Sequence, residues 1–189
     1  MRREVRHAVG RRLQFAAAEL SCPLPMSRGW LQSNFRGSIA AMLTATHTAP
    51  AIPGVDPGNG PMLVMFFETD CPTCQMTVPY LNKLARSAPV IGISQDDDVA
   101  TNQFKEQFAL AFPVQLDPGF ALSRSLDLTF VPTLFLIDTE GRVLQSHFGF
   151  DKSALNELAA QMGCGPVADE FDGLPHRKPG CMSRHLEKK

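Results

Sequence analysis

The chain has 189 residues, a hydrophobic fraction of 44% and a formal net charge of −1, which suits one domain with extensions. The near-zero charge gives no support for a protein that binds nucleic acid or another polyanion. The sequence contains no run of 18 or more apolar residues, so we expect no transmembrane helix.

The two ends of the chain differ from its middle. Residues 1–57 are rich in Arg and Ala at the start and in Pro and Gly at the end, so we expect a poorly ordered leader and linker. The apolar patch at residues 13–20 is interrupted by Gln14 and Glu19, unlike the long uncharged core of a signal peptide. Residues 58–163 form the expected domain. The tail at residues 164–189 is rich in Gly, Pro and charge and is expected to lack regular structure.

The most informative motif is Cys71-Pro72-Thr73-Cys74. It follows the apolar run at residues 62–67 and precedes a helix-like run at residues 75–85. Pro72 suits the first turn of a helix, where its missing N–H costs nothing. Two thiols at this spacing can close a small disulfide ring, and the N–H groups at a helix start stabilise a thiolate on the first of them. The motif therefore predicts a redox site.

The rest of the domain alternates between strand-like and helix-like segments. Buried strands are expected at residues 61–68 and 90–93, and the acids Asp96-Asp97-Asp98 offer an N-cap for a helix through residue 110. A short strand at 112–117 and a short helix to 126 follow. Gly141 turns the chain between strands at 133–138 and 142–148, and Asp151 or Ser153 caps a last helix to 162. This order predicts an α/β fold whose central mixed β-sheet is flanked by helices.

No metal or cofactor is expected. The Asp run is better explained as a capped turn than as a metal site, and zinc usually needs two ligand pairs, whereas Cys164 and Cys181 do not form a close pair. Two interpretations of Cys164 and Cys181 stay open. They are two unrelated free thiols, or they form a second disulfide that pins the tail and persists only in an oxidising compartment.

Across residues 58–163 the chain resembles the thioredoxin superfamily, and within it the TlpA/ResA-like branch of the redoxins, which is related to AhpC/TSA proteins. The likeness rests on the Cys71-Pro72-Thr73-Cys74 motif, on FPVQLDP at residues 112–118 and on VPTLFLIDTEGRV at residues 131–143. It implies a thioredoxin-like fold with a TlpA/peroxiredoxin-type helix–strand insertion at residues 99–117. It also implies that Pro132 is a cis-proline beside the disulfide, with Val131 free to pair with an extended substrate.

The chain departs from that family in its acidic residues. Met65 and Thr77 stand where relatives carry a carboxylic acid that assists proton transfer, and Asp70 replaces an aromatic residue. Glu68 and Asp70 flank Cys71, and we expect their charges to raise the pKa of its thiol against the effect of the helix dipole. Proton transfer would then use Glu68, Asp70 or water.

Three functions are weighed. The first is a monomeric thiol–disulfide oxidoreductase that acts on protein thiols and disulfides with an unidentified redox partner, Cys71 attacking and Cys74 resolving. The second is a thiol peroxidase, although Thr69 lies two rather than three residues before Cys71. The third is a binding module with a static disulfide. The resemblance suggests a periplasmic or extracytoplasmic location, and the lack of a clear signal peptide keeps a cytoplasmic one open.

Overall fold

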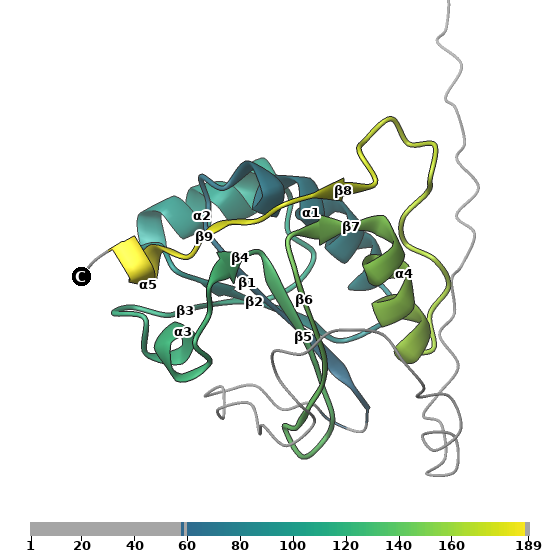
Figure 1. The fold of residues 1–189 in the computed structure, drawn as a ribbon, viewed down its shortest axis with the longest axis horizontal. Helices are drawn as coiled ribbons and strands as arrows, with labels where there is room; N and C mark the ends of the chain where they lie inside the picture. The colour runs from purple at the N-terminus through teal and green to yellow at the C-terminus, as the bar shows by residue number, and fades with distance from the viewer. Residues whose placement is uncertain (1–57, 59, 188–189) are drawn as a thin grey trace, which may run out of the picture.

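The computed structural model describes residues 58 and 60–187, so the expected leader and linker at 1–57 lie outside the described residues. The centre of the fold is a five-stranded sheet with the strand order β3-β2-β1-β5-β6 (Figure 1). Its strands are β1 (Met62–Phe67), β2 (Val90–Ser94), β3 (Val114–Leu116), β5 (Thr133–Ile137) and β6 (Val143–Phe148). Strands β1, β2 and β3 are parallel, whereas β5 is antiparallel to both β1 and β6. The predicted mixed sheet is therefore confirmed.

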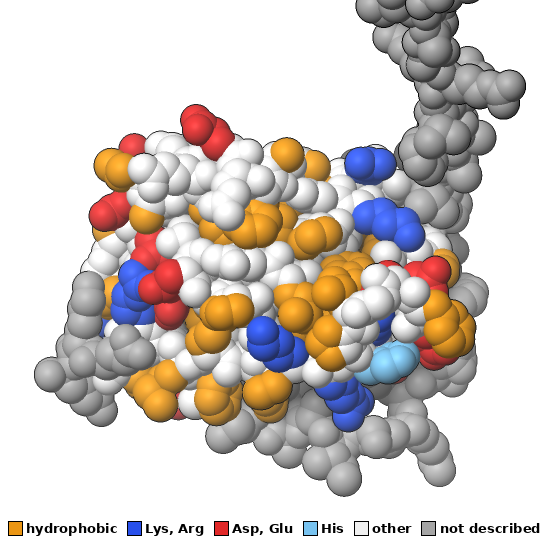
Figure 2. Space-filling model, turned by 90° about the horizontal axis from the view of Figure 1, so that it is seen from above, with side chains coloured by type: hydrophobic (Ala, Val, Ile, Leu, Met, Phe, Trp, Pro, Cys, Tyr) orange, Lys and Arg blue, Asp and Glu red, His pale blue; other side chains and the backbone are white. Residues whose placement is uncertain are grey.

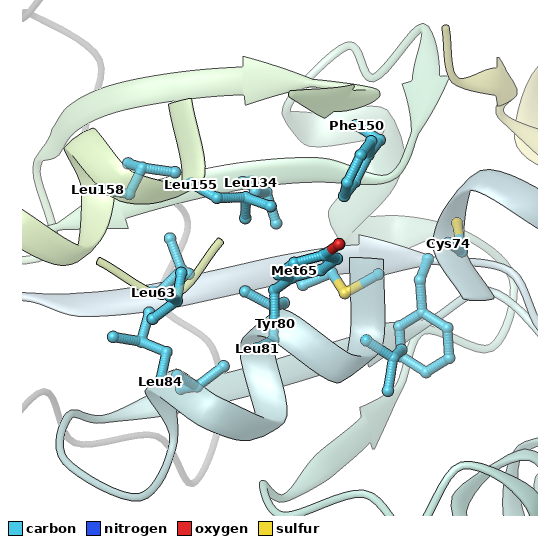
Figure 3. Packing of buried hydrophobic residues seen from close by; sticks show 14 of the residues in the cluster. Leu63, Met65, Cys74, Tyr80, Leu81, Leu84, Leu134, Phe150, Leu155 and Leu158 are labelled. Atoms are coloured by element: carbon cyan, nitrogen blue, oxygen red, sulfur yellow. The ribbon is translucent and has the colours of Figure 1, made fainter. Parts of the chain in front are cut away.

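Helices lie on both faces of this sheet. Successive side chains of β1 point to opposite faces, so they belong alternately to two hydrophobic clusters, one on each face. Leu63 and Met65 belong to the cluster that is covered by α1 (Pro72–Leu84) and α4 (Lys152–Gln161) (Figure 3). Phe104 of α2 (Asp98–Gln107) belongs to the same cluster. Val64 and Phe66 face the other cluster, which Leu122 of α3 (Ala121–Ser125) contacts. All six residues of β1 are buried, as expected for a strand with helices on either side.

The helix caps and the hairpin turn form as the sequence predicts. Asp97 caps α2 by accepting a hydrogen bond from the Ala100 N–H at 2.8 Å. Asp151, rather than Ser153, caps α4, because its carboxylate accepts hydrogen bonds from the first N–H groups of that helix. Gly141 has a φ of 75° between β5 and β6, which is the left-handed conformation that a glycine adopts without strain.

The expectation that the tail lacks regular structure is wrong. β8 (Arg177–Lys178) pairs with β7 (Phe150–Asp151), and β9 (Cys181–Met182) pairs with β4 (Phe130–Val131). The chain then continues into α5 (Arg184–Glu187). Figure 1 shows this yellow segment running from β8 past β4 to α5. The tail is ordered by backbone partners on distant strands rather than by a hydrophobic pattern of its own.

The outer surface on the side of α1 and α2 is of mixed character. Figure 2 shows hydrophobic side chains near the middle of this face, with acidic and basic side chains in small separate groups. Within the described part of the chain, no helix is both long and apolar enough to cross a membrane.

Candidate redox site

Cys71 and Cys74 lie together at the start of α1. Cys71 is the N-cap residue, and its sulfur accepts a hydrogen bond from the Cys74 backbone N–H at 3.4 Å. Pro72 begins the helix, as expected from its missing N–H. Both cysteines are free thiols; Cys71 is 2% exposed and Cys74 is fully buried, at one end of the core cluster (Figure 3). The motif thus places one sulfur at the helix start and the other one turn inside.

The two thiols differ sharply in acidity. The pKa of Cys71 is lowered to about 5, and the largest cause is the hydrogen bond from the Cys74 side chain. Burial raises the pKa of Cys71, whereas hydrogen bonds from the Cys181 thiol and from the backbone N–H groups of Cys74 and Thr73 lower it further. Burial and the neighbouring Cys71 sulfur raise the pKa of Cys74 well above its ordinary value. When both thiols are reduced, the thiolate of the pair is therefore Cys71, and Cys74 is protonated.

The proline loop contacts Cys71 directly. The Val131–Pro132 peptide bond is cis, as the resemblance implies, and the Val131 carbonyl oxygen lies 3.6 Å from Cys71 Sγ. Val131 itself is not free to pair with a substrate in this structure. It is paired with Cys181 in the β4–β9 ladder, so the expectation of an open edge is corrected here.

Cys181 lies beside Cys71, a position that the sequence did not predict. Its thiol is free and donates a hydrogen bond to the sulfur of Cys71, whereas Cys164 is disulfide-bonded. A disulfide between Cys164 and Cys181 is therefore excluded in this structure. The neighbouring Pro179 and Gly180 are typical of a loop, and the odd number of cysteines was the one sequence signal that pointed to an unpaired thiol.

The acids that flank Cys71 do not act as expected. The pKa of Cys71 is lowered, and the carboxylates of Glu68 and Asp70 are both engaged by Arg184. The Arg184 backbone N–H donates to Glu68 Oε1 at 2.6 Å, its guanidinium lies 2.7 Å from Asp70 Oδ1, and it also pairs with Asp96. This single cation from the tail offsets part of the negative charge that the three acids bring to the site.

Glu68 is the buried carboxyl group of the site. Burial raises its pKa to about 7, although the hydrogen bond and the charge of Arg184 lower it. It neighbours the other two thiols, because its backbone N–H lowers the pKa of Cys74 and its charge raises the pKa of Cys181. Thr77, where the resemblance implied an acid, donates its hydroxyl to the Thr73 carbonyl at 2.8 Å.

Among residues 58 and 60–187, no group of three or more His, Cys, Asp or Glu side chains is placed to hold a metal ion. Hydrogen bonds connect the three thiols, and Arg184 binds the three carboxylates near them.

Comparison with known proteins places the chain in a family. The chain is 34% identical over 94 residues to the thiol-disulfide oxidoreductase ResA of Bacillus thuringiensis, with 47% of this chain and 54% of ResA covered. It is 32% identical over 92 residues to a thiol:disulfide interchange protein DsbE homolog of Paracoccus denitrificans, with 48% and 51% covered. The chain thus spans about half the length of these curated relatives.

The crystal structure of StoA from Bacillus subtilis matches 47% of this chain and 73% of StoA, with 19% identity and a TM-score of 0.44. The Redoxin family model matches residues 57–162, more than half of the 189 residues. The chain therefore belongs to the Redoxin family.

Proposed function

We propose that this domain is a thiol–disulfide oxidoreductase in which Cys71 attacks and Cys74 resolves. The observation that carries the proposal is the unequal placement of the two thiols. Cys71 caps α1 and accepts hydrogen bonds that stabilise its thiolate, while Cys74 is buried one turn further and stays protonated. A thiolate that persists at neutral pH next to a protonated partner is the arrangement that disulfide exchange requires.

The reaction follows from this arrangement in two exchanges. The Cys71 thiolate attacks one sulfur of a substrate disulfide; a bond between Cys71 Sγ and that sulfur forms, and the other substrate sulfur leaves as a thiolate. Cys74 then loses its proton and attacks Cys71 Sγ, which closes the Cys71–Cys74 disulfide and releases the second substrate sulfur. Two electrons pass from the protein to the substrate, and the reverse sequence oxidises a substrate dithiol.

Glu68 is the side chain best suited to carry the proton that Cys74 loses. Its pKa of about 7 allows it to accept and return a proton near neutral pH, and its backbone lies in contact with Cys74. Asp70 is less suited, because its side chain is 73% exposed and bound to Arg184. We infer that Glu68 takes the part that an acid at Met65 or Thr77 would take in relatives.

The surroundings of the site favour a protein substrate. Phe130 and Phe148 stack with their ring centroids 5.5 Å apart next to the cis-proline loop, and Phe148 and Met182 are both more than half exposed. Exposed apolar groups of this kind bind apolar side chains of a partner. Structural disulfides persist mainly in oxidising compartments, so the disulfide at Cys164 supports our inference that the protein acts outside the cytoplasm. Intact-mass analysis after alkylation without reductant checks that bond.

Reduction of insulin by dithiothreitol tests the proposed function. We expect the wild-type chain to accelerate insulin precipitation, Cys71→Ser to abolish the effect, and Cys74→Ser to retain attack on the disulfide but lose turnover. Gly60→Ala is the control, because a methyl group at Gly60 meets no atom within 4 Å. Consumption of hydrogen peroxide without insulin reduction would favour a peroxidase, and failure of both activities would favour a binding module.

A further inference from the structure

The last strand of the chain lies where an extended substrate would bind. We propose that β9 is an internal substrate, in which Cys181 exchanges with the Cys71–Cys74 disulfide to give a Cys71–Cys181 disulfide that closes the site to other proteins. This inference rests on the proposed function, because it uses Cys71 as the reacting sulfur. Cys181 then becomes a third redox residue of the site, and the tail regulates access to it.

The backbone of β9 fits closely against the proline loop. Cys181 pairs with Val131 in antiparallel register, one residue before Pro132. Gly180 permits this approach, because a Cβ atom there would lie 2.6 Å from the Val131 carbonyl oxygen. On the other side, the Thr73 hydroxyl donates to the Pro179 carbonyl at 2.9 Å. The segment is therefore held between the start of α1 and β4, and its thiol points to the sulfur that would attack a substrate.

Contacts on the C-terminal side of Cys181 hold the strand in place. The Ser183 N–H donates to the Thr129 carbonyl at 2.9 Å, and the Ser183 hydroxyl interacts with buried Gln95. Arg184 then binds Glu68, Asp70 and Asp96 through its backbone and guanidinium groups. Because both flanks are fixed, the thiol of Cys181 is present at the site at a high effective concentration.

The acidity of the three sulfurs assigns their parts in the exchange. The Cys181 thiol donates a hydrogen bond to Cys71, which is one of the causes that lower the pKa of Cys71. Burial and the Cys71 sulfur raise the pKa of Cys181 to about 11. In the fully reduced site the charge therefore stays on Cys71, with a protonated thiol on each side of it. Exchange with Cys181 begins only after Cys71 has been oxidised.

The exchange is balanced within the chain. In the oxidised protein Cys181 loses a proton and attacks Cys71 Sγ; the bond between Cys71 and Cys181 forms, and the bond between Cys71 and Cys74 breaks. Cys74 leaves as a thiolate and takes up a proton. One disulfide and one thiol are present before and after the step, so no external oxidant or reductant is needed.

Disulfide mapping of the full chain tests the proposal. Reduced Cys74→Ser protein is treated with oxidised glutathione, acid-quenched, alkylated and digested without reductant, and the linked peptides are identified by mass spectrometry. We expect a Cys71–Cys181 link as the main product. Adding Gly180→Ala should weaken docking of the tail and lower the yield of the Cys71–Cys181 link about tenfold, which corresponds to about 1.4 kcal/mol. Adding Gly60→Ala should leave the yield unchanged.

If the Gly180→Ala chain does not fold, Arg184→Ala is a second variant that loosens the tail. It should also lower the yield of the Cys71–Cys181 link. The proposal is wrong if Cys74→Ser accumulates glutathione on Cys71 while Cys181 is fully alkylated. Failure of the proposed function looks different. In that case Cys71 takes up no glutathione in any variant, and Cys181→Ser forms no Cys71–Cys74 disulfide.

Discussion

Removing the Cys74 thiol should raise the pKa of Cys71, because the hydrogen bond from Cys74 is the largest cause of its low value of about 5. A hydrogen bond to a charged group contributes about 1.5–3 kcal/mol, and one pKa unit corresponds to about 1.4 kcal/mol. Cys74→Ala should therefore raise the pKa of Cys71 by about 1–2 units. The bonds from Cys181 and from the backbone N–H groups of Cys74 and Thr73 remain in this variant, so the value should stay below that of a free thiol.

Titration of the thiolate absorbance in the ultraviolet measures this change in fully reduced protein. Iodoacetamide labelling rates as a function of pH give an independent value for Cys71. Cys74→Ser is the matched control, because its hydroxyl can still donate a hydrogen bond and should shift the pKa less than Cys74→Ala does. Equal pKa values in wild type and Cys74→Ala would refute the reasoning, since the Cys74 thiol would then contribute nothing and the stabilisation would come from Cys181 and the helix start.

Two further predictions concern packing and pH. Gly92→Ala should lower the free energy of unfolding by about 1–3 kcal/mol in urea denaturation, because the new methyl group would lie 2.9 Å from the Phe67 ring, whereas Gly60→Ala should have no effect. The pKa of Glu68 is raised from 4.5 to about 7, so its stabilising contribution is complete below pH 4.5 and is lost as the pH rises through 7. In oxidised protein Cys71 does not titrate, so Glu68→Gln should remove the fall in the free energy of unfolding between pH 4.5 and 7. If the free energy of unfolding of this variant depends on pH as in the wild type, the prediction is wrong.

Much of the domain could be predicted because its signals are local. The strand before Cys71 is a continuous apolar run, and such runs with helices on either side are buried on both faces. Asp97 and Asp151 cap helices through N–H groups two or three residues further on. Gly141 needs only its own backbone conformation to make the turn. Each of these features is decided within a few residues of the chain.

The tail could not be predicted because its structure is decided by distant residues. β9 has two residues, too few to carry a hydrophobic period, and its partner strand lies 50 residues earlier, with Val131 opposite Cys181. The effect of Glu68 and Asp70 on Cys71 was misjudged for the same reason. Adjacency in sequence predicted the two acids near the thiol, but nothing in the sequence indicated that Arg184 would bind both of them.

The contact between Thr73 and Pro179 joins residues that are 106 positions apart, which has a consequence for the protein during translation. The ribosome makes α1, the sheet and α4 before it makes β9, and domains begin to fold as they emerge. Until the tail is made, Val131 has an unpaired backbone edge and the acids near Cys71 lack the cation of Arg184. The complete set of contacts around Cys71 can therefore form only after residues 179–184 have been made.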